Sequence, residues 1–324
     1  MKKPIVVLAL AVALGNSGSA SAQAYPSRPI TMVVGAPAGG PTDTIARIVA
    51  ERMRSLLGQT ILIENNAAAA SSVAAGRVAR AAPDGYTLSI GHWGSHVVNG
   101  VIYELPYDVL NDFAPIGLIA SAPQLIVSNN AVPAKDLKSL IGWLKANPGK
   151  AAQGTGGVGS PAHIGGIFFQ ATTGTRFLFV PYRGAAPAMQ DLLAGQVDLM
   201  FDQATNSLPQ VRAGKIRAYA VTAKNRLSAA PEIPTVDEAG LPGFYVAVWH
   251  GLWAPKGTPK DVIAKLNSAV VDALADPVVR SRLFDLGQEI FPREQQTPEA
   301  LGAFQRSEIE KWWPIIKAAN IKGE

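Results

Sequence analysis

Short apolar runs that are typical of buried strands alternate with amphipathic helical segments along most of this 324-residue chain. Residues 30–34 form the first such run, and the helical pattern of 42–57 follows it before Gly58 ends the helix. The same order returns with a strand-like run at 60–64 and a helical segment at 73–81. Because strands buried on both faces read as continuous apolar runs, this alternation predicts an α/β fold with helices on both faces of a parallel sheet.

The alternation restarts in the middle of the chain, which predicts two lobes. An apolar run at 125–127 opens a second α/β unit. We expect lobe 1 to be discontinuous, formed by 25–124 and 224–324, and lobe 2 to span 125–223, each with its own central, mostly parallel sheet. Further strands are expected at 86–90, 177–180, 197–201, 217–222 and 244–253, and further helices at 136–146, 185–194, 206–213, 259–275, 277–286 and 298–312.

The first 24 residues have the layout of a secretory signal peptide. Lys2 and Lys3 precede an apolar run at 4–14, and Ala-Gln-Ala at 22–24 offers a small-residue cleavage site. We expect cleavage after Ala24 and, in a bacterium, a periplasmic protein. The apolar run is too short to span a bilayer as a helix, and no later stretch reaches eighteen uncharged apolar residues.

Cysteine is absent, and the charge balance is close to neutral. The lack of cysteine excludes a disulfide framework, a thiol nucleophile, a lipoprotein anchor and cysteine-ligated metal centres. Loss of Lys2 and Lys3 with the signal peptide lowers the formal net charge from +5 to +3. A surplus this small, without basic clusters interleaved with aromatic residues, argues against nucleic acid as a partner and weakly favours a small anionic ligand.

A glycine-rich loop at 35–43 joins the first predicted strand to the first predicted helix. Glycines let the backbone approach a ligand, and the free N–H groups of a first helical turn favour a carboxylate or phosphate. We expect Thr42 and Asp43 to cap the helix. The loop lacks both the Walker motif and the GxGxxG spacing, and taken alone it could equally be a structural turn.

A second loop of this kind, at 155–163, follows a predicted strand in lobe 2 and precedes a helix that begins at Pro161. Ser160 is expected to cap this helix, and its hydroxyl could also meet a ligand oxygen. One such helix start in each lobe implies a cleft that holds a single anionic ligand from both sides.

The loop at 91–96 carries His92 and His96 at the end of another predicted strand. Their spacing of four could suggest a metal, but no glutamate lies between them and no third ligand is evident, so we expect no metal. Open α/β sheets bind ligands at the carboxyl ends of their strands, which makes His92 and Ser95 candidate ligand contacts.

Polar residues at two strand ends of lobe 2 are further candidates. Tyr182 and Arg183 could reach the cleft, although Arg183 could instead pair with a surface carboxylate. Asp202 could orient a ligand ammonium group or hold the start of the following helix.

The sequence shows no recognisable set of catalytic residues. Ser160 and His163 could suggest a hydrolase, but Val158 and Ala162 stand where a nucleophile elbow needs glycine. The chain has four histidines and no close pair of carboxylates in these loops. We therefore expect a binding protein without catalytic residues.

Short motifs follow one another in order from residue 25 to residue 259. They are Tyr-Pro-Ser-Arg-Pro-Ile at 25–30, Pro-Ala-Gly-Gly-x-x-Asp at 37–43, Leu-Pro-Tyr-Asp at 105–108, Asp-Phe-Ala-Pro-Ile at 112–116, Gly-Ser-x-x-His at 159–163, Pro-Tyr-Arg-Gly at 181–184, Gly-Gln-Val-Asp at 195–198 and Trp-x-Gly-Leu-x-Ala-Pro-x-Gly-Thr-Pro at 249–259. With these motifs the chain closely resembles the extracytoplasmic solute receptors of the tripartite tricarboxylate transporter group, often called the Bug family.

The resemblance implies a two-lobed periplasmic binding protein of the Venus-flytrap kind, type II-like, that has no enzymatic activity and no cofactor. Such a receptor delivers its ligand to a membrane permease. In the family, backbone amides and small hydroxyls of the two glycine-rich loops hold a ligand carboxylate, partly through ordered water. Carried over by motif, these positions are Ala38, Gly39, Gly40 and Asp43 in lobe 1, and Gly159, Ser160 and His163 in lobe 2.

The ligand is expected to be a mono-, di- or tricarboxylate or an aromatic acid, and the protein a monomer. The 91–96 loop carries His-Trp where smaller residues are common in the family, so Trp93 is expected to stack on an aromatic acid. Two alternatives remain open. One is a periplasmic serine hydrolase that uses Ser160 and His163, and the other is a partner that presents its ligand to a membrane sensor kinase.

Overall fold

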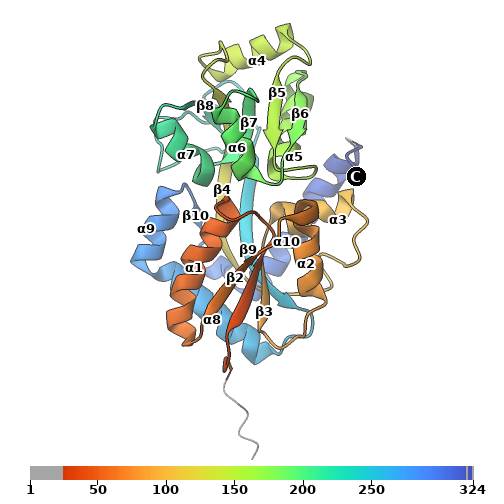
Figure 1. Cartoon of the computed structure of the whole chain (residues 1–324), viewed down its shortest axis with the longest axis vertical. Coiled ribbons are helices and arrows are strands. Elements are labelled where there is room, and N and C mark those ends of the chain that lie inside the picture. The colour runs from red at the N-terminus through yellow and green to blue at the C-terminus, as the bar shows by residue number, and fades with distance from the viewer. Residues whose placement is uncertain (1–24, 319, 323–324) are drawn as a thin grey trace, which may run out of the picture.

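Two α/β lobes lie one above the other in the molecule (Figure 1). The computed structural model describes residues 25–318 and 320–322, and the predicted signal peptide lies outside this range. The lower lobe contains the first strands and the last helix, and the middle of the chain forms the upper lobe. Among the described residues, no helix is long and apolar enough to cross a membrane.

The sheet of the lower lobe has the strand order β2-β1-β3-β9-β4. β1 pairs in parallel with β2 and β3, whereas β9 is antiparallel to both β3 and β4, and the short β10 is antiparallel to β4. The strands are β1 (Ile30–Val34), β2 (Ile61–Asn65), β3 (Thr87–His92), β4 (Phe113–Asn129), β9 (Ala247–Pro255) and β10 (Glu289–Ile290).

The sheet of the upper lobe continues from β4 in the order β4-β7-β5-β6, and β8 also pairs with β4. β5 is parallel to β6 and β7, while β7 and β8 are antiparallel to β4. The strands are β5 (Ala152–Thr155), β6 (Leu178–Pro181), β7 (Leu199–Gln203) and β8 (Ile216–Val221).

The 17-residue strand β4 runs through both lobes. It pairs with β9 as far as Pro123 and with β7 and β8 from Gln124 onward. The sequence predicted the second half of this strand but not its continuity with the first half. The expected mostly parallel sheets are therefore mixed sheets, because β4 runs through both lobes antiparallel to β7, β8 and β9, and β9 is also antiparallel to β3.

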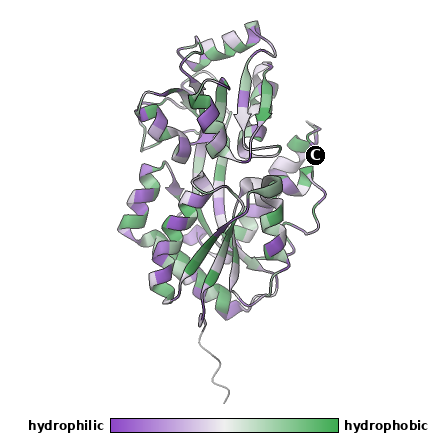
Figure 2. Ribbon diagram, in the orientation of Figure 1, coloured by the Kyte–Doolittle hydropathy of each residue, from purple (hydrophilic) through white to green (hydrophobic). Residues whose placement is uncertain are grey.

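Helices cover both faces of the sheet in each lobe, as the alternation predicted. The lower lobe has α1 (Pro41–Leu57), α2 (Ser72–Ala79), α3 (Asn99–Ile102), α8 (Lys260–Ala275), α9 (Pro277–Asp285) and α10 (Pro298–Ala318). The upper lobe has α4 (Leu137–Ala146), α5 (Pro161–Thr173), α6 (Ala185–Leu193) and α7 (Ala204–Arg212). Outer helices such as α4 alternate hydrophilic and hydrophobic residues along their length (Figure 2).

The cores follow the alternation of side chains along the strands. In β1, Ile30 and Met32 point into a cluster with α1 and α8, and Val33 points into a second cluster with α2 and α10. In β7, Met200 packs with α6 and α7, and Phe201 packs with α4 and α5. Every central strand is thus buried on both faces, which explains why these strands read as continuous apolar runs.

The segment after β8 packs on the upper lobe. Leu227, Ala230 and Ile233 belong to the upper cluster around α6 and α7, and Thr235 forms a parallel bridge with Val221. This packing indicates that the chain re-enters the lower lobe near residue 246, just before β9. The sequence pattern suggested that it re-enters at residue 224.

Candidate functional site

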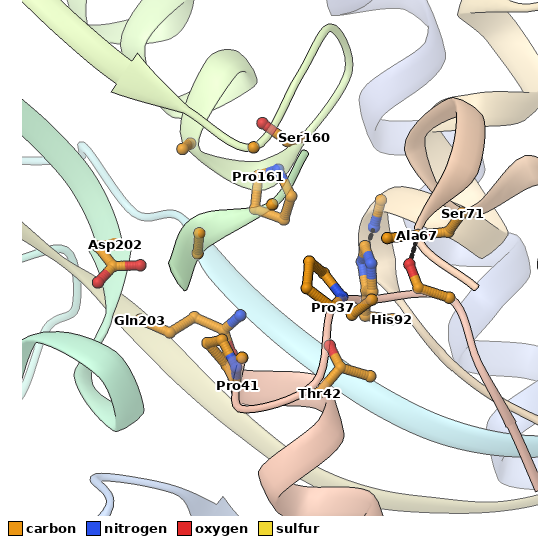
Figure 3. Close-up of a pocket in the computed structure, with 18 of the residues that line it drawn as sticks. Pro37, Pro41, Thr42, Ala67, Ser71, His92, Ser160, Pro161, Asp202 and Gln203 are labelled. Carbon is orange, nitrogen blue, oxygen red and sulfur yellow. Dashed lines mark hydrogen bonds between the residues drawn. The ribbon is translucent and has the colours of Figure 1, made fainter. Parts of the chain in front are cut away.

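A cavity lies between the two lobes, beside the crossing strands (Figure 3). It encloses about 740 Å³ of empty space, counting the solvent in its mouth. The lower lobe lines it with residues 35–37 and 40–42 of the β1–α1 loop, with Ala67 and Ser71, and with His92 and Gly94 at the end of β3. The upper lobe lines it with residues 156, 159–162, 183–185 and 201–203.

Four helices direct their N-terminal ends at this cavity. The N-cap residues of α1, α5, α6 and α7 are Gly40, Ser160, Gly184 and Gln203, and all four line it. The amides of a first helical turn have no partner within the helix and carry the positive end of the helix dipole. The cavity is therefore built to attract an anion. Sequence reasoning identified the starts of α1 and α5 as anion sites. It predicted helices near α6 and α7 but did not assign their starts to the cavity, although Gly184 directly after a strand was a usable signal.

Asp43 fixes the shape of the β1–α1 loop through hydrogen bonds, and its side chain does not line the cavity. Its side chain is 2% exposed, and its Oδ2 accepts hydrogen bonds from Gly39 N (2.8 Å) and Arg47 Nε (2.9 Å). Its Oδ1 accepts from Asn65 Nδ2 (2.9 Å). Burial opposes ionisation, but the hydrogen bonds from Arg47, Gly39 and Asn65 outweigh it and lower the pKa of Asp43.

Only one of the four predicted loop positions in the lower lobe lines the cavity. Gly40 does, whereas Ala38, Gly39 and Asp43 do not. The predicted cap at Thr42 and Asp43 is also wrong: the N-cap of α1 is Gly40, and no side chain caps the helix. Because the side chain of Asp43 is used to hold the loop, the first-turn amides stay uncapped.

Ser160 and His163 form a helix cap and not a catalytic pair. Ser160 Oγ accepts from His163 N (3.3 Å), as predicted, and His163 Nδ1 accepts from Gly159 N (3.1 Å). The imidazole packs edge-on against Phe179, and burial lowers its pKa to about 4. Ser160 and Gly159 line the cavity, but His163 does not, because its ring is turned into the loop.

Of the candidate side chains in the loop at 91–96, His92 lines the cavity, and Gly94 lines it beside His92. His92 Nδ1 accepts from Gly94 N (3.0 Å), and burial lowers its pKa to about 4. Ser95 Oγ bonds to the backbone N–H and carbonyl of His92. His96 stacks on Trp253, with ring centroids 3.9 Å apart. Ser95 therefore shapes the loop rather than lining the cavity, and the two histidine rings contact different partners, His250 for His92 and Trp253 for His96.

Trp93 lies in the hydrophobic core. It is 0% exposed and packs edge-on against Trp312, with ring centroids 4.9 Å apart. The expectation that it stacks on an aromatic ligand is therefore wrong in this arrangement.

The loop after β6 carries one free cation. Arg183 is exposed at the mouth, and among the described residues its guanidinium has no hydrogen bond or ion pair. Tyr182 donates its hydroxyl to Asp191 Oδ2 (2.6 Å) and lines an adjoining cavity that shares Arg183 with the first. The expected surface partner for Arg183 is not found in this part of the chain.

Asp202 is a buried carboxylate in the cavity wall, where it lies beside Gln203 in Figure 3. It is 3% exposed, and its Oδ2 accepts from Asn206 Nδ2 (2.9 Å) and Ser207 Oγ (2.6 Å). Burial raises its pKa to about 6, although these hydrogen bonds favour the charged form. Asp202 thus holds the first turn of α7, as one of the two sequence interpretations stated, and also lines the cavity.

Several lining residues were not predicted from the sequence. Thr42 and Gln203 reach the cavity from helix starts, and Gln124 reaches it from the crossing strand β4. Thr42 Oγ1 lies 3.2 Å from Nε2 of His250 on β9. Their positions depend on which strands meet at the lobe junction, and no local pattern encodes that.

The two lobes are in contact beside the cavity, and Tyr103 and Val158 line the adjoining cavity. Tyr103 donates its hydroxyl to the Val158 carbonyl across the lobes (2.6 Å). A Cβ atom added to Gly184 would lie 2.5 Å from Pro37 Cγ. Within the described residues, no group of three or more histidine, aspartate or glutamate side chains could hold a metal ion.

Comparison with known proteins agrees with this architecture. The family model described as "Tripartite tricarboxylate transporter family receptor" matches residues 45–321. The chain is similar to the solved periplasmic binding protein BugD, with 41% identity and a TM-score of 0.88 over 93% of this chain and 100% of that one.

Two further similar structures contain carboxylates. MatC from Rhodopseudomonas palustris, solved with bound malate, is 40% identical with a TM-score of 0.87 over 90% of this chain and 100% of that one. Another R. palustris protein, solved with adipate, is 33% identical with a TM-score of 0.88 over 93% and 100%. The family that the sequence motifs indicated is thereby confirmed, and the chain belongs to the receptors of the tripartite tricarboxylate transporter family.

Proposed function

We propose that this chain captures a small carboxylate between its two lobes in the periplasm and delivers it to a tripartite tricarboxylate-type membrane permease. The observation that carries the proposal is the convergence of four helix N-termini on the interlobe cavity. Amides and dipoles arranged in this way favour an anion over a neutral or cationic ligand. The malate and adipate bound by two similar proteins support a carboxylate.

The side chains of the cavity favour a short ligand with at least one carboxylate. The lower lobe presents neutral polar groups, Thr42 and His92, and the upper lobe presents the hydroxyl of Ser160 and, at the mouth, Arg183. The acidic side chain in the lining is Asp202, which accepts two hydrogen bonds from its own helix. A dicarboxylate with one end at α1 and the other toward Arg183 would meet donors at both ends.

Binding is proposed to bring the lobes together. We propose lobe 1 as residues 25–124 with the segment from about 246 onward, and lobe 2 as the residues between. The change of β4 partners after Pro123 and the packing of residues 227–233 support these limits. A ligand can favour the closed form only by contacting it better than the open form, and the contact of Tyr103 with Val158 is available only when the lobes meet.

A hydrolytic function has little support, since the imidazole of His163 makes no hydrogen bond to Ser160 Oγ. We propose secretion by cleavage after Ala24 and action as a monomer. Presentation of the ligand to a membrane sensor kinase is the second candidate. Ligand uptake in cells with and without the permease genes separates the two, because a pure sensor partner leaves uptake unchanged.

A thermal-shift and calorimetric screen tests the proposal. The probes are malate, succinate, adipate and benzoate, with succinamide as a neutral analogue of matched size. A carboxylate at about 100 times its Kd should add roughly 2.7 kcal/mol to the free energy of unfolding. The proposal fails if none of the four acids raises the melting temperature, or if succinamide raises it as much as succinate does.

A further inference from the structure

Two imidazoles stand behind the α1 end of the cavity. His92 on β3 and His250 on β9 are register partners in an antiparallel pair, and their ring centroids lie 6.1 Å apart. His92 lines the cavity, whereas His250 is 0% exposed and reaches it only through Thr42. The distance from His250 Nε2 to Thr42 Oγ1 is 3.2 Å.

The burial of His250 decides which of its nitrogen atoms carries the proton. Burial, and then the neighbouring His92, lower the pKa of His250 to about 3, so the ring is neutral at physiological pH and holds one N–H. Nδ1 is buried without a hydrogen-bond partner among the described residues. An orphaned buried N–H is less readily tolerated than an acceptor with an unused lone pair. The proton therefore belongs on Nε2, which donates it to Thr42 Oγ1.

This donation leaves the Thr42 hydroxyl proton free for the cavity. Thr44, two residues further along α1, donates its hydroxyl to the Gly40 carbonyl (3.1 Å), as hydroxyls in helices commonly do. Thr42 has no such internal acceptor among the described residues, and it lines the cavity beside the uncapped amides of α1. Its O–H can therefore serve a ligand oxygen.

We propose that His250 is a positioning residue for the ligand carboxylate: through Nε2–H it holds Thr42 as a hydrogen-bond donor into the cavity. This inference rests on the proposed carboxylate binding. His92 supplies a second donor to the same end, because Gly94 N donates to its Nδ1 and leaves Nε2–H for the cavity. In this proposal His92 donates directly to the ligand carboxylate, and His250 acts on it through the hydroxyl of Thr42.

The tautomer is the first test, and it needs no ligand. Long-range proton–nitrogen correlation spectra of the folded protein should show His250 as a neutral ring with the proton on Nε2. The chain has four histidines, so substitution of each in turn by Gln assigns the signals. A neutral ring protonated on Nδ1, or a charged imidazolium at pH 7, would overturn the proposal even if every variant at position 250 failed to fold.

The second test is a double-mutant cycle read by calorimetry with the tightest binder among malate, succinate, adipate and benzoate. Thr42→Val should weaken binding about tenfold, as expected for a lost hydrogen bond to a charged group. His250→Phe should weaken it about three- to tenfold, and adding it to Thr42→Val should cost less than a further twofold. His250→Gln, whose amide nitrogen can take the place of Nε2, should restore affinity to within about twofold of the parent.

Thr44→Val is the matched control, because it removes a hydroxyl from the same helix turn without changing the cavity lining. It should leave affinity unchanged. Additive losses in the cycle, or a folded His250→Phe that binds like the parent, would overturn the positioning role. If the parent binds none of the four acids, the proposed function fails and the ligand role fails with it, whereas the spectra still decide whether His250 donates to Thr42.

Discussion

The two sides of the cavity offer an anion different chemistry. The lower side presents Thr42, His92 and the uncapped start of α1, and its acid, Asp43, is turned away and held by Arg47. The upper side presents charged groups, with Asp202 in the wall and Arg183 at the mouth. The lower side is thus a surface of neutral hydrogen-bond donors. The charge of the upper side depends on the ionisation of Asp202, which varies with pH, and on where the side chain of Arg183 lies.

This difference suggests that the lower side sets the affinity for carboxylates in general and that the upper side sets the preference among them. A neutral donor surface binds any carboxylate end with little dependence on pH, since its histidines stay uncharged above about pH 4. We then expect ligands to be discriminated at the upper surface, which carries the titrating Asp202. Changes on the lower side should alter affinity for all acids alike, and changes on the upper side should alter preference among them.

The largest expected effect is the loss of the lower surface itself. Asp43→Ala removes the acceptor of hydrogen bonds from Gly39, Arg47 and Asn65. We expect the free energy of unfolding to fall by about 2–3 kcal/mol, the range for removing a hydrogen-bonded charged group. Affinity for every acid should fall with it, because the loop that presents Gly40 and the α1 amides loses its support. Chemical denaturation and calorimetry measure the two effects.

Asp285→Ala is the control for this change, because it removes an exposed carboxylate that has no hydrogen bond among the described residues. It should alter stability by less than about 0.5 kcal/mol. If Asp43→Ala were as mild, the β1–α1 loop would hold its shape without the buried carboxylate.

Ser160→Ala should come next, on the upper side. Loss of the N-cap should lower stability by about 1 kcal/mol. If the hydroxyl also meets a charged ligand oxygen, affinity should fall by roughly 1–3 kcal/mol in addition. Asp136→Ala is the matched control, because Asp136 caps α4 at the far end of the upper lobe. It should lower stability by a similar amount and leave affinity unchanged; equal affinities for both variants would reduce Ser160 to a cap.

Asp202 should give the upper surface its pH dependence. Its pKa of about 6 lies above the ordinary 3.8, so the folded protein binds more protons between these values, and stability falls as pH rises through this window. Affinity for succinate should fall about three- to tenfold from pH 5 to pH 7.5, because the ionised side chain repels the ligand. Asp202→Asn should remove most of the pH dependence of both the stability and the succinate affinity. Comparing the affinities of the parent and the variant at each pH removes the contribution of the ligand's own titration. A ratio of parent affinity to Asp202→Asn affinity that stays constant or rises from pH 5 to pH 7.5 would contradict the prediction.

Much of the fold could be predicted from the sequence because local patterns encode it. The strands β1 to β3 and the helices α1, α8 and α9 lie within a few residues of their expected positions. The continuity of β4 was missed, since Pro115 near its start and Pro123 near its middle interrupt the apolar run. The return at 224 was also misplaced, because residues 227–233 pack against a lobe that sequence order alone does not identify.

The site residues also fall into those that local sequence predicts and those that it does not. Positions set by a local motif were predicted at the cavity, among them Gly40, Ser160, Gly159 and Arg183. Side chains whose direction depends on distant partners were not: Trp93 packs in the core against Trp312, and the ring of His163 turns toward Phe179 and away from the cavity. His250 and Gln124 were not predicted because their roles arise from pairing between strands that are distant in sequence, β3 with β9 and β4 with β7.

The smallest expected effect concerns the contact that joins the two sides. Tyr103→Phe removes the hydroxyl that donates to Val158 and leaves the ring in place. Affinity should fall about two- to fivefold, the equivalent of one ordinary hydrogen bond, since this bond forms only when the lobes meet. Stability without ligand should change little. Tyr245→Phe removes a comparable hydroxyl bonded to Asp237 on the surface, away from the cavity lining, and should leave affinity unchanged. Small-angle scattering should show that Tyr103→Phe populates a more open form at subsaturating ligand; if it does not, the two sides are held together by the ligand alone, and the neutral and charged surfaces bind independently of this contact.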